Sequence, residues 1–200
     1  MKQQATVVVV LILAIALFLS GCSLVGLPGP SALTDAGEGS AALEDAAIAV
    51  TFPDGWLLES PPSVPSLGVA TALEPDQRDL LVPLVTAMPP TRHDRCVVAD
   101  IAPLVDARPE WQTLADVVAG FEHLLAADPR RVGLDITTLE LPAGQTGRIS
   151  WTVRGEAESV STYIFRRADA WFILECVAQS VPPPDWRSIA TGFEFLQEDE

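Results

Sequence analysis

The sequence predicts an α+β fold in which helices flank an antiparallel β-sheet. Three observations support this class. Four strand-like runs with short connections fill much of the C-terminal half, one amphipathic helix precedes them, and an alternating run before a Pro-Asp-Gly turn opens the body of the chain. Short connections between strands favour an antiparallel meander, and helices outside such a meander pack on its faces.

The first predicted strand covers Ala46–Phe52 and ends at the turn Pro53-Asp54-Gly55. Ile48, Val50 and Phe52 alternate along it, which indicates one buried face. Four segments follow before the next helix: a proline-rich loop at 60–66 and short strands at Val69–Leu73, Leu80–Ala87 and Cys96–Leu104.

One amphipathic helix is predicted over Leu114–Ala127. Its apolar residues follow one another at intervals of 3, 1, 3, 3 and 1, which places them on one helix face. Thr113 and Asp116 approximate a capping box at its start, with Asp in place of the usual Glu. Asp128-Pro129 ends the helix, because proline has no N–H to continue the hydrogen-bond ladder.

Strands connected by short links are predicted after this helix: Val132–Leu141, Thr146–Val153, Glu158–Arg166 and Trp171–Ala178. A short helix near Trp186–Thr191 follows them, with Asp185 as its N-cap. The body closes with Gly192–Leu196, which contains two phenylalanines in alternation.

The N-terminus has the layout of a secretory signal peptide, predicted to cover residues 1–21. Lys2 precedes an apolar or small-residue run from Val7 to Leu19. As a helix this run is about 20 Å long, shorter than a hydrocarbon core of roughly 30 Å. Leu19-Ser20-Gly21-Cys22 resembles a bacterial lipobox, which implies lipidation of the Cys22 thiol and cleavage between Gly21 and Cys22.

An uncleaved membrane anchor is the alternative, since the run from Val7 to Leu27 is long enough to span. Both alternatives export the body of the protein, because Lys2 is the only basic residue near the segment and positive charge stays cytoplasmic. We therefore expect a protein attached to the cell membrane through its lipid anchor and facing the extracytoplasmic side. One acyl chain alone holds weakly, whereas a multiply acylated cysteine is a stable anchor.

Residues 22–44 are rich in Gly, Ser, Pro and Ala and predict a flexible tether. Residues 45–200 then form one globular domain. Without residues 1–21 the chain has 27 acidic residues and 11 arginines, a net charge of about −16. A field of that sign repels the phosphates of nucleic acids, so no nucleic-acid partner is expected.

Four segments resemble parts of the PsbP-like domains and follow one another in the same order. This family includes the LpqN-like lipoproteins. The four segments are Ala49–Trp56, Leu141–Gly144, Trp171–Cys176, and the terminal helix followed by Gly192–Phe195. The resemblance spans about residues 46–196 and is poorest from Ser60 to Arg95. It implies an α/β/α sandwich around an antiparallel sheet and a non-catalytic binding or accessory role, with no catalytic set to carry over.

Cys96 and Cys176 are the two cysteines left once Cys22 is acylated. Two body cysteines in an exported chain favour a disulfide, and buried free thiols are the alternative. A bond would join the strand before the long helix to the last strand of the meander. Closing a loop of that length stabilises by roughly 4–5 kcal/mol in the entropy model.

No catalytic residue, cofactor or metal site is predicted. His93 lies three residues before Cys96 on an extended segment, so the two side chains would point to opposite sheet faces. His123 falls off the apolar stripe of the predicted helix and is expected in solvent. Zinc needs three or four ligands at suitable spacing, and the sequence has no such cluster. Ser40 lacks the second glycine of a nucleophile elbow and is assigned to the tether.

Three functions remain open at this point. The first is a non-catalytic envelope lipoprotein that binds or assists an unidentified envelope protein. The second is a carrier of a lipid or another apolar ligand, which an apolar cavity near the five tryptophans would favour, although core packing explains most of them. The third is an envelope hydrolase, which a cleft that joins His93 to carboxylates would favour.

Overall fold

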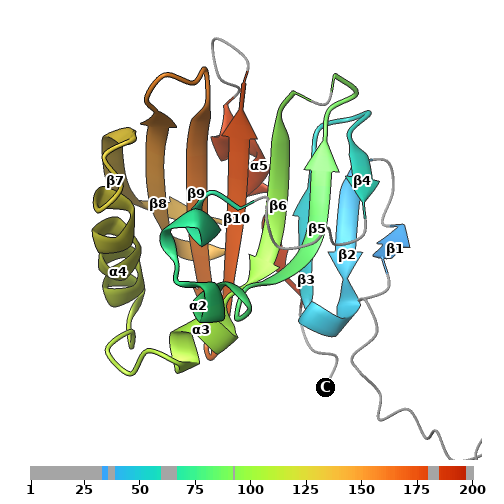
Figure 1. The fold of residues 1–200 in the computed structure, drawn as a ribbon. Helices are drawn as coiled ribbons and strands as arrows, with labels where there is room; N and C mark the ends of the chain where they lie inside the picture. The colour runs from blue at the N-terminus through green and yellow to red at the C-terminus, as the bar shows by residue number, and fades with distance from the viewer. Residues whose placement is uncertain (1–32, 36–38, 60–66, 92, 180–184, 197–200) are drawn as a thin grey trace, which may run out of the picture.

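The computed structural model describes residues 33–35, 39–59, 67–91, 93–179 and 185–196 of the chain. Their strands form a seven-stranded sheet and a four-stranded sheet, and all pairings are antiparallel. Helices pack against the larger sheet (Figure 1). The predicted α+β class is therefore confirmed.

The predicted signal peptide, the lipidation site Cys22 and the predicted loop at 60–66 lie outside the described residues. Among the helices of the described part of the chain, none has the length and apolar character needed to cross a bilayer.

The larger sheet contains the predicted meander. Its strands, in spatial order, are β4 (Leu57–Glu59), β5 (Val82–Met88), β6 (Arg95–Asp100), β10 (Ala170–Ala178), β9 (Ser159–Arg167), β8 (Gly144–Val153) and β7 (Arg131–Leu141). The strands β7 to β10 pair in chain order, as their short links predict. Strand β6 then pairs with β10, although the whole of α4 and the meander separate them in sequence.

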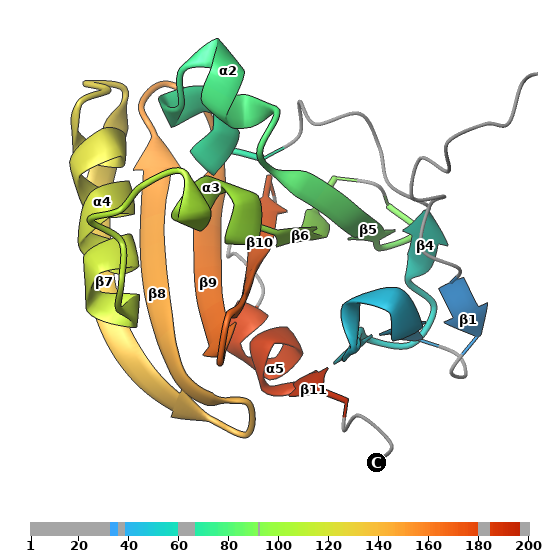
Figure 2. The same cartoon turned by 90° about the horizontal axis from the view of Figure 1, so that it is seen from below.

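Helices cover one face of this sheet (Figure 2). They are α2 (Pro75–Arg78), α3 (Ala102–Asp106), α4 (Leu114–Ala126) and the 3-10 helix η3 (Val69–Ala72). The predicted apolar face of α4 is buried through Val117, Phe121 and Leu125. Complete burial of each such side chain contributes about 1.5–3 kcal/mol, so this face fixes the helix on the sheet.

Two helices begin at the predicted caps. Thr113 Oγ1 accepts a hydrogen bond from the Asp116 N–H at 3.2 Å, and the Asp116 carboxylate accepts one from the Thr113 N–H at 2.8 Å. Helix α5 (Trp186–Thr191) begins after Asp185, whose carboxylate accepts a hydrogen bond from the Arg187 N–H at 3.1 Å. Both caps satisfy N–H groups that have no partner within the helix.

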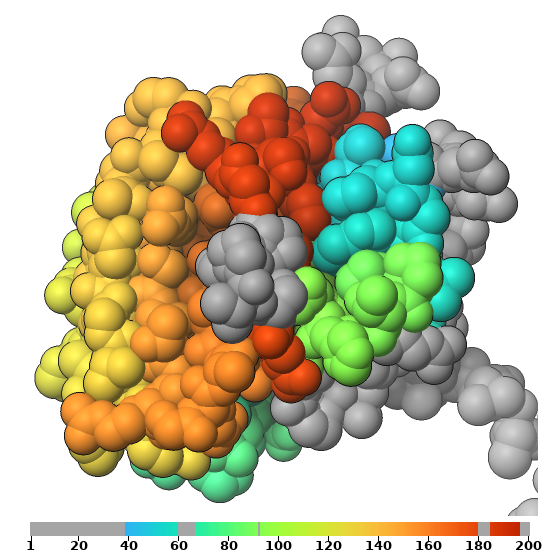
Figure 3. Space-filling view, turned by 90° about the horizontal axis from the view of Figure 1, so that it is seen from above, coloured from blue at the N-terminus to red at the C-terminus, as the bar shows by residue number. Residues whose placement is uncertain are grey.

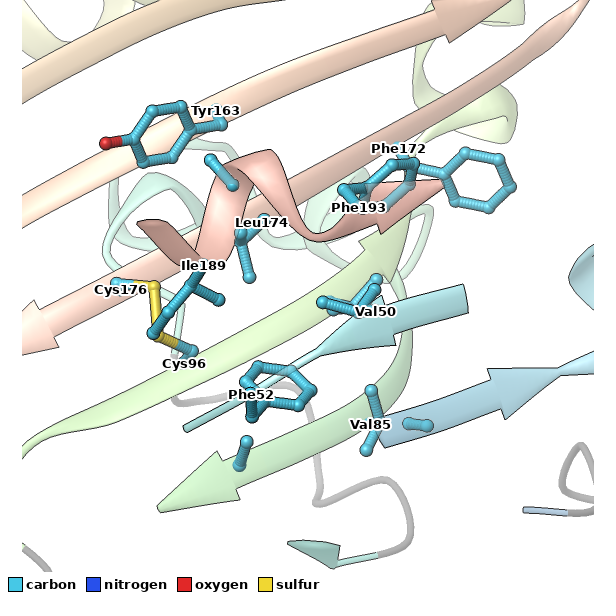
Figure 4. Packing of buried hydrophobic residues seen from close by; sticks show 14 of the residues in the cluster. Val50, Phe52, Val85, Cys96, Tyr163, Phe172, Leu174, Cys176, Ile189 and Phe193 are labelled. Atoms are coloured by element: carbon cyan, nitrogen blue, oxygen red, sulfur yellow. A yellow bond between two sulfur atoms is a disulfide. The ribbon is translucent and has the colours of Figure 1, made fainter. Parts of the chain in front are cut away.

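The four-stranded sheet lies on the opposite face. It contains β1 (Leu33–Asp35), β2 (Ser40–Leu43), β3 (Ile48–Thr51) and β11 (Phe193–Phe195), and the 3-10 helix η1 (Glu44–Ala46) links two of them. Strand β3 is the predicted first strand, and its Val50 pairs with Phe193 near the other end of the body. Phe193 stacks on Phe165 of β9 with ring centroids 3.9 Å apart, so the two sheets share one core (Figure 4).

The predicted tether extends too far into the chain. Ser40–Leu43 is a strand, and its Ala41 and Leu43 are buried against the core. These four residues contain too few apolar side chains to show a period, and β3, their partner, supplies the pairing that orders them. The domain therefore begins before residue 45.

The predicted strand at Val69–Leu73 is wrong, because this segment forms η3. The N–H groups of Gly68 and Val69 donate to the carboxylate of Glu175 and not to a neighbouring strand. Glu175 is more than 100 residues away in the sequence, so no local pattern contains this partner.

The predicted strand Cys96–Leu104 is correct only in its first part. Strand β6 ends at Asp100, and α3 begins at Ala102. The Asp100 carboxylate accepts a hydrogen bond from the Ala102 N–H at 2.7 Å, and Pro103 follows within the first turn, where proline is tolerated.

Candidate functional site

The small sheet and α5 cover only part of the second face of the large sheet. The buried cluster on this face draws side chains from β5, β6, β9 and β10, and from the end of β7 at Leu141. Among the described residues, β8 contributes no side chain to that cluster. In Figure 2, α5 lies below β9 and β10, and β7 and β8 extend beyond it. The second face of β7 and β8 is therefore open beside α5.

Polar side chains form rows across this open face. In β8, Ile149 and Trp151 are buried on the side of α4, so the residues between them point to the open side. Strand pairing arranges the polar residues in three rows: Thr137–Arg148–Tyr163, Asp135–Ser150–Ser161 and Thr152–Ser159. Neighbours in such rows have Cβ atoms about 4.5–5.5 Å apart, so the rows gather hydroxyl and charged groups.

A groove of about 350 Å³ lies between these rows and the start of α5. The polar side chains that line it include those of Arg148, Ser150, Ser161, Tyr163, Asp185 and Arg187. In the space-filling view, the yellow-to-orange surface of β7–β9 adjoins the red surface of α5 (Figure 3). Small-molecule sites usually enclose about 300–1,000 Å³ and are mostly apolar. This groove has a suitable size, and its lining favours a polar ligand.

Arg148 is only partly satisfied by its neighbours. Its Nη2 donates to Asp135 Oδ2 at 3.3 Å and to Ser150 Oγ at 3.2 Å. The ion pair with Asp135 is exposed to solvent, and exposed pairs contribute about 0–1 kcal/mol. The Arg148 Nε atom is buried and has no acceptor among the described residues. A ligand oxygen cannot reach this buried atom, but Arg148 Nη1 also has no acceptor among the described residues and is not buried, so it is free to donate to a ligand.

The start of α5 forms the other wall. Trp186 is buried and lies edge-on to Trp56, with ring centroids 6.3 Å apart. Trp56 in turn stacks on Phe52 at 6.0 Å. This aromatic packing holds the first turn of α5, so Asp185 and Arg187 on either side of Trp186 keep their place along the groove.

Tyr163 lies where the apolar and polar parts of this face meet. Its ring belongs to the buried cluster, and Figure 4 shows its hydroxyl pointing away from Phe172 and Phe193. Burial raises the pKa of the Tyr163 phenol, the nearby Asp185 raises it further, and Arg148 and Arg187 lower it. The phenol is therefore protonated at neutral pH and is a hydrogen-bond donor.

Among the described residues of its lining, the groove has hydrogen-bonding groups and no nucleophile paired with a base. A serine nucleophile needs a base within hydrogen-bond reach. Among the described lining residues, Asp185 is the only one with a side chain that could accept a proton, and its carboxylate caps α5. His123 is exposed on α4, which lies on the opposite face of the sheet, and His93 is exposed and outside the lining.

Cys96 and Cys176 form a disulfide in the structure. The sequence left open whether this pair is bonded or remains as two free thiols. The two residues are directly paired in β6 and β10, and both are fully buried (Figure 4). Neither sulfur is available as a thiolate.

Other candidates from the sequence are not brought together. Ser40 lies on β2, where its hydroxyl donates to Thr51 Oγ1 at 3.4 Å. In the described part of the chain, no three His, Cys, Asp or Glu side chains form a group that could hold a metal. The tryptophans pack in the cores: Trp111, Trp151, Trp171 and Trp186 are buried, and Trp56 is half-buried.

Sequence reasoning missed the groove, although a signal for it was present. Strands β8 and β9 alternate between apolar residues and the hydroxyls of Ser150, Thr152, Ser159 and Ser161. By contrast, β10 is buried on both faces from Trp171 to Ala178. The alternation therefore indicates that one face of β8 and β9 meets solvent.

A second polar feature, also missed, lies inside the helix-side core. The Glu175 carboxylate is 1% exposed and accepts hydrogen bonds from Gly68 N–H, from Val69 N–H at 3.0 Å, and from Thr162 Oγ1 at 3.0 Å. Burial raises the pKa of Glu175, and these three hydrogen bonds oppose that rise. The guanidinium of Arg131 donates to Thr71 Oγ1 in the same turn. This network holds η3 on the sheet and has a structural role.

Comparison with known proteins finds similarity to solved structures. No protein-family model matches the chain, and no curated protein matches it. The chain is similar to the solution structure of cyanobacterial PsbP (CyanoP) from Synechocystis sp. PCC 6803, with a TM-score of 0.48 and 12% sequence identity. The match covers 88% of this chain and 97% of that chain.

Proposed function

We propose that the protein is a non-catalytic binding module of the cell envelope, attached to the membrane through a lipid on Cys22. The groove between α5 and β7–β9 binds a small polar ligand. The observation that carries this proposal is the lining of the groove, where hydroxyl rows and Arg148 of the sheet face Arg187 of α5, and the described lining residues include no nucleophile in contact with a base.

Polar binding is favoured over the carriage of an apolar ligand. A carrier needs apolar side chains that remain accessible to the ligand. In this groove the aromatic residues Trp151, Tyr163 and Trp186 are 2%, 2% and 4% exposed, so their rings offer little surface. The accessible groups are hydroxyls and guanidiniums, which recognise a ligand by hydrogen bonds.

A groove-filling variant tests the binding site. The full-length protein in detergent would be titrated with glucose, glucuronate, glucosamine and inorganic phosphate, with binding followed by ligand-detected NMR. Thr152 is exposed and lines the groove, so Thr152→Trp is expected to abolish binding of whichever probe the wild type binds.

Thr138→Trp is the matched control, because Thr138 is an exposed threonine of β7 outside the groove lining. It should bind as the wild type does. Saturable binding that survives Thr152→Trp, or no saturable binding of any probe by the wild type, would contradict the proposed site.

The lipid anchor is supported by the lipobox Leu19-Ser20-Gly21-Cys22 and needs its own test. Cells that express the wild type are expected to incorporate labelled palmitate into a protein that lacks residues 1–21. Cys22→Ser should remove both the label and the cleavage. If the wild type stays in the membrane with residues 1–21 still present and takes up no label, the result would instead support the uncleaved anchor.

A further inference from the structure

We infer that the ligand of the groove carries an oxyanion, a carboxylate or a phosphate, and that Arg148 and Arg187 bind it. This inference rests on the proposed function, since it names the chemical class of the ligand for the same groove.

The charge distribution is the first argument. The chain has 27 acidic residues against 12 basic ones, a net charge of −15. Two arginines nevertheless line the groove, whereas Asp185 is the only acidic residue among the lining residues that the structure describes. Asp135 pairs with Arg148 beside the lining, so two basic and two acidic side chains gather here, in a molecule whose acidic residues outnumber its basic ones by more than two to one.

The hydrogen bonds of Arg148 are the second argument. A guanidinium has five N–H donors in a planar fork, and an oxyanion is bound best when it takes two of them in parallel. Asp135 and Ser150 both use Nη2, and the buried Nε has no acceptor among the described residues. The buried Nε is closed to a ligand, but Nη1 also has no acceptor among the described residues and is not buried. A ligand oxyanion can therefore bind at the end of the fork, through Nη1 and the Nη2 for which Asp135 competes.

The second arginine and the hydroxyls complete the site. Arg187 is exposed, and its guanidinium makes no hydrogen bond with a described residue. Arg148, Arg187 and Tyr163 all line the same groove. The protonated phenol and Ser161 then offer further hydrogen bonds to the polar remainder of the ligand.

Substitution of Asp135 should change anion binding in the opposite direction from substitution of the arginines. The Asp135 carboxylate is half exposed and pairs with Arg148, so it competes with a ligand oxyanion for the same guanidinium. Removal of this negative charge should strengthen anion binding. If Arg148 only supported the fold, the loss of its partner would not improve binding.

The experiment is a titration of the full-length protein in detergent with glucuronate, inorganic phosphate and glucose, followed by ligand-detected NMR. Glucuronate, phosphate or both should bind at least about tenfold more tightly than the neutral glucose, as expected for a charge-assisted pair. Preference for glucuronate identifies a carboxylate ligand, and preference for phosphate identifies a phosphate ligand.

Variants assign the effect to the two arginines. Arg148→Gln and Arg187→Gln should each weaken anion binding about tenfold, while Asp135→Asn should strengthen it about threefold. Arg154→Gln is the matched control, because Arg154 is exposed on the β8–β9 connection outside the lining. Arg187 lies on the surface of α5, so its variant tests the inference even if Arg148→Gln unfolds.

The outcomes separate the two proposals. Glucose binding as tight as that of the anions, lost in Thr152→Trp, would overturn the oxyanion inference and leave the groove as a binding site. Anion binding that Arg148→Gln, Arg187→Gln and Arg154→Gln weaken equally would also overturn it. No saturable binding of any probe would overturn both proposals.

Discussion

The carboxylate of Glu175 accepts a hydrogen bond from the backbone N–H of Val69 at 3.0 Å, across 106 residues of sequence. Glu175 lies in the central strand β10, and Val69 begins η3, so this contact ties a surface turn to the middle of the sheet. The same carboxylate accepts hydrogen bonds from Gly68 and Thr162. These three donors replace water around the buried carboxyl group.

The raised pKa of Glu175 predicts a pH dependence of stability. Burial raises this pKa above the unfolded value of about 4.5, so the folded state holds the proton over a pH range in which the unfolded state has lost it. The contribution of Glu175 is therefore most favourable below the unfolded pKa and is lost as the pH rises through the folded pKa. Glu175→Gln should remove this part of the decline as the pH rises above about 4.5, the unfolded value.

Urea unfolding across that pH range measures the effect, and Glu140→Gln at an exposed position of β7 is the control. A Glu175→Gln curve parallel to that of the wild type would show that Glu175 does not titrate abnormally.

The disulfide predicts a large loss of stability when both cysteines are removed. Cys96 and Cys176 are 80 residues apart in sequence. The bond closes that loop and so lowers the conformational entropy of the unfolded chain. Replacement of both by alanine should lower the free energy of unfolding by about 2–5 kcal/mol, as is typical when a native disulfide is lost.

Because both sulfurs are fully buried, reductant should not reach them in the folded protein. Mass spectrometry after alkylation should find Cys96 and Cys176 unlabelled under native conditions with dithiothreitol, and labelled once urea is added. Labelling without reductant would show free thiols and refute the bond.

A side chain added at Gly147 of β8 would collide with α4. A Cβ at this position would lie 2.3 Å from Val118 Cγ2, closer than any packed pair of carbons. Gly147→Ala should therefore destabilise by about 1–3 kcal/mol through overpacking. Val118→Ala should relieve it, so that the double variant loses less stability than the two single losses combined.

Thermal unfolding of the four proteins in this cycle gives the coupling energy. Gln145→Ala, at an exposed position of the same strand, should change little. Additive losses in the double variant would mean that β8 and α4 do not approach each other as described.

The capping box of α4 predicts a smaller effect. Thr113 and Asp116 exchange hydrogen bonds at the exposed start of the helix. Thr113→Ala should lower the free energy of unfolding by about 1 kcal/mol, the usual value for loss of an N-cap. Gln112→Ala, one residue earlier and also exposed, should have a smaller effect in the same urea titration.

Local patterns in the sequence were enough to predict the meander, α4, α5 and their caps. In β8, the alternation of Ile149 and Trp151 with polar residues is a period of two, and the stripe of Val117, Phe121 and Leu125 is close to a period of 3.6. Each pattern lies within one element and needs no distant partner. The α+β class follows from such elements in their order.

The remaining features depend on partners that are far apart in the chain. Val69 begins a 3-10 helix because Glu175 accepts its N–H, and Ser40–Leu43 is a strand because β3 and β11 extend the same small sheet. The groove arises in the same way. The polar rows around Arg148 were present in the sequence, but the position of α5 beside them was set by Trp186 packing on Trp56. Period and capping act within a few residues, whereas burial is decided by which segments meet in three dimensions.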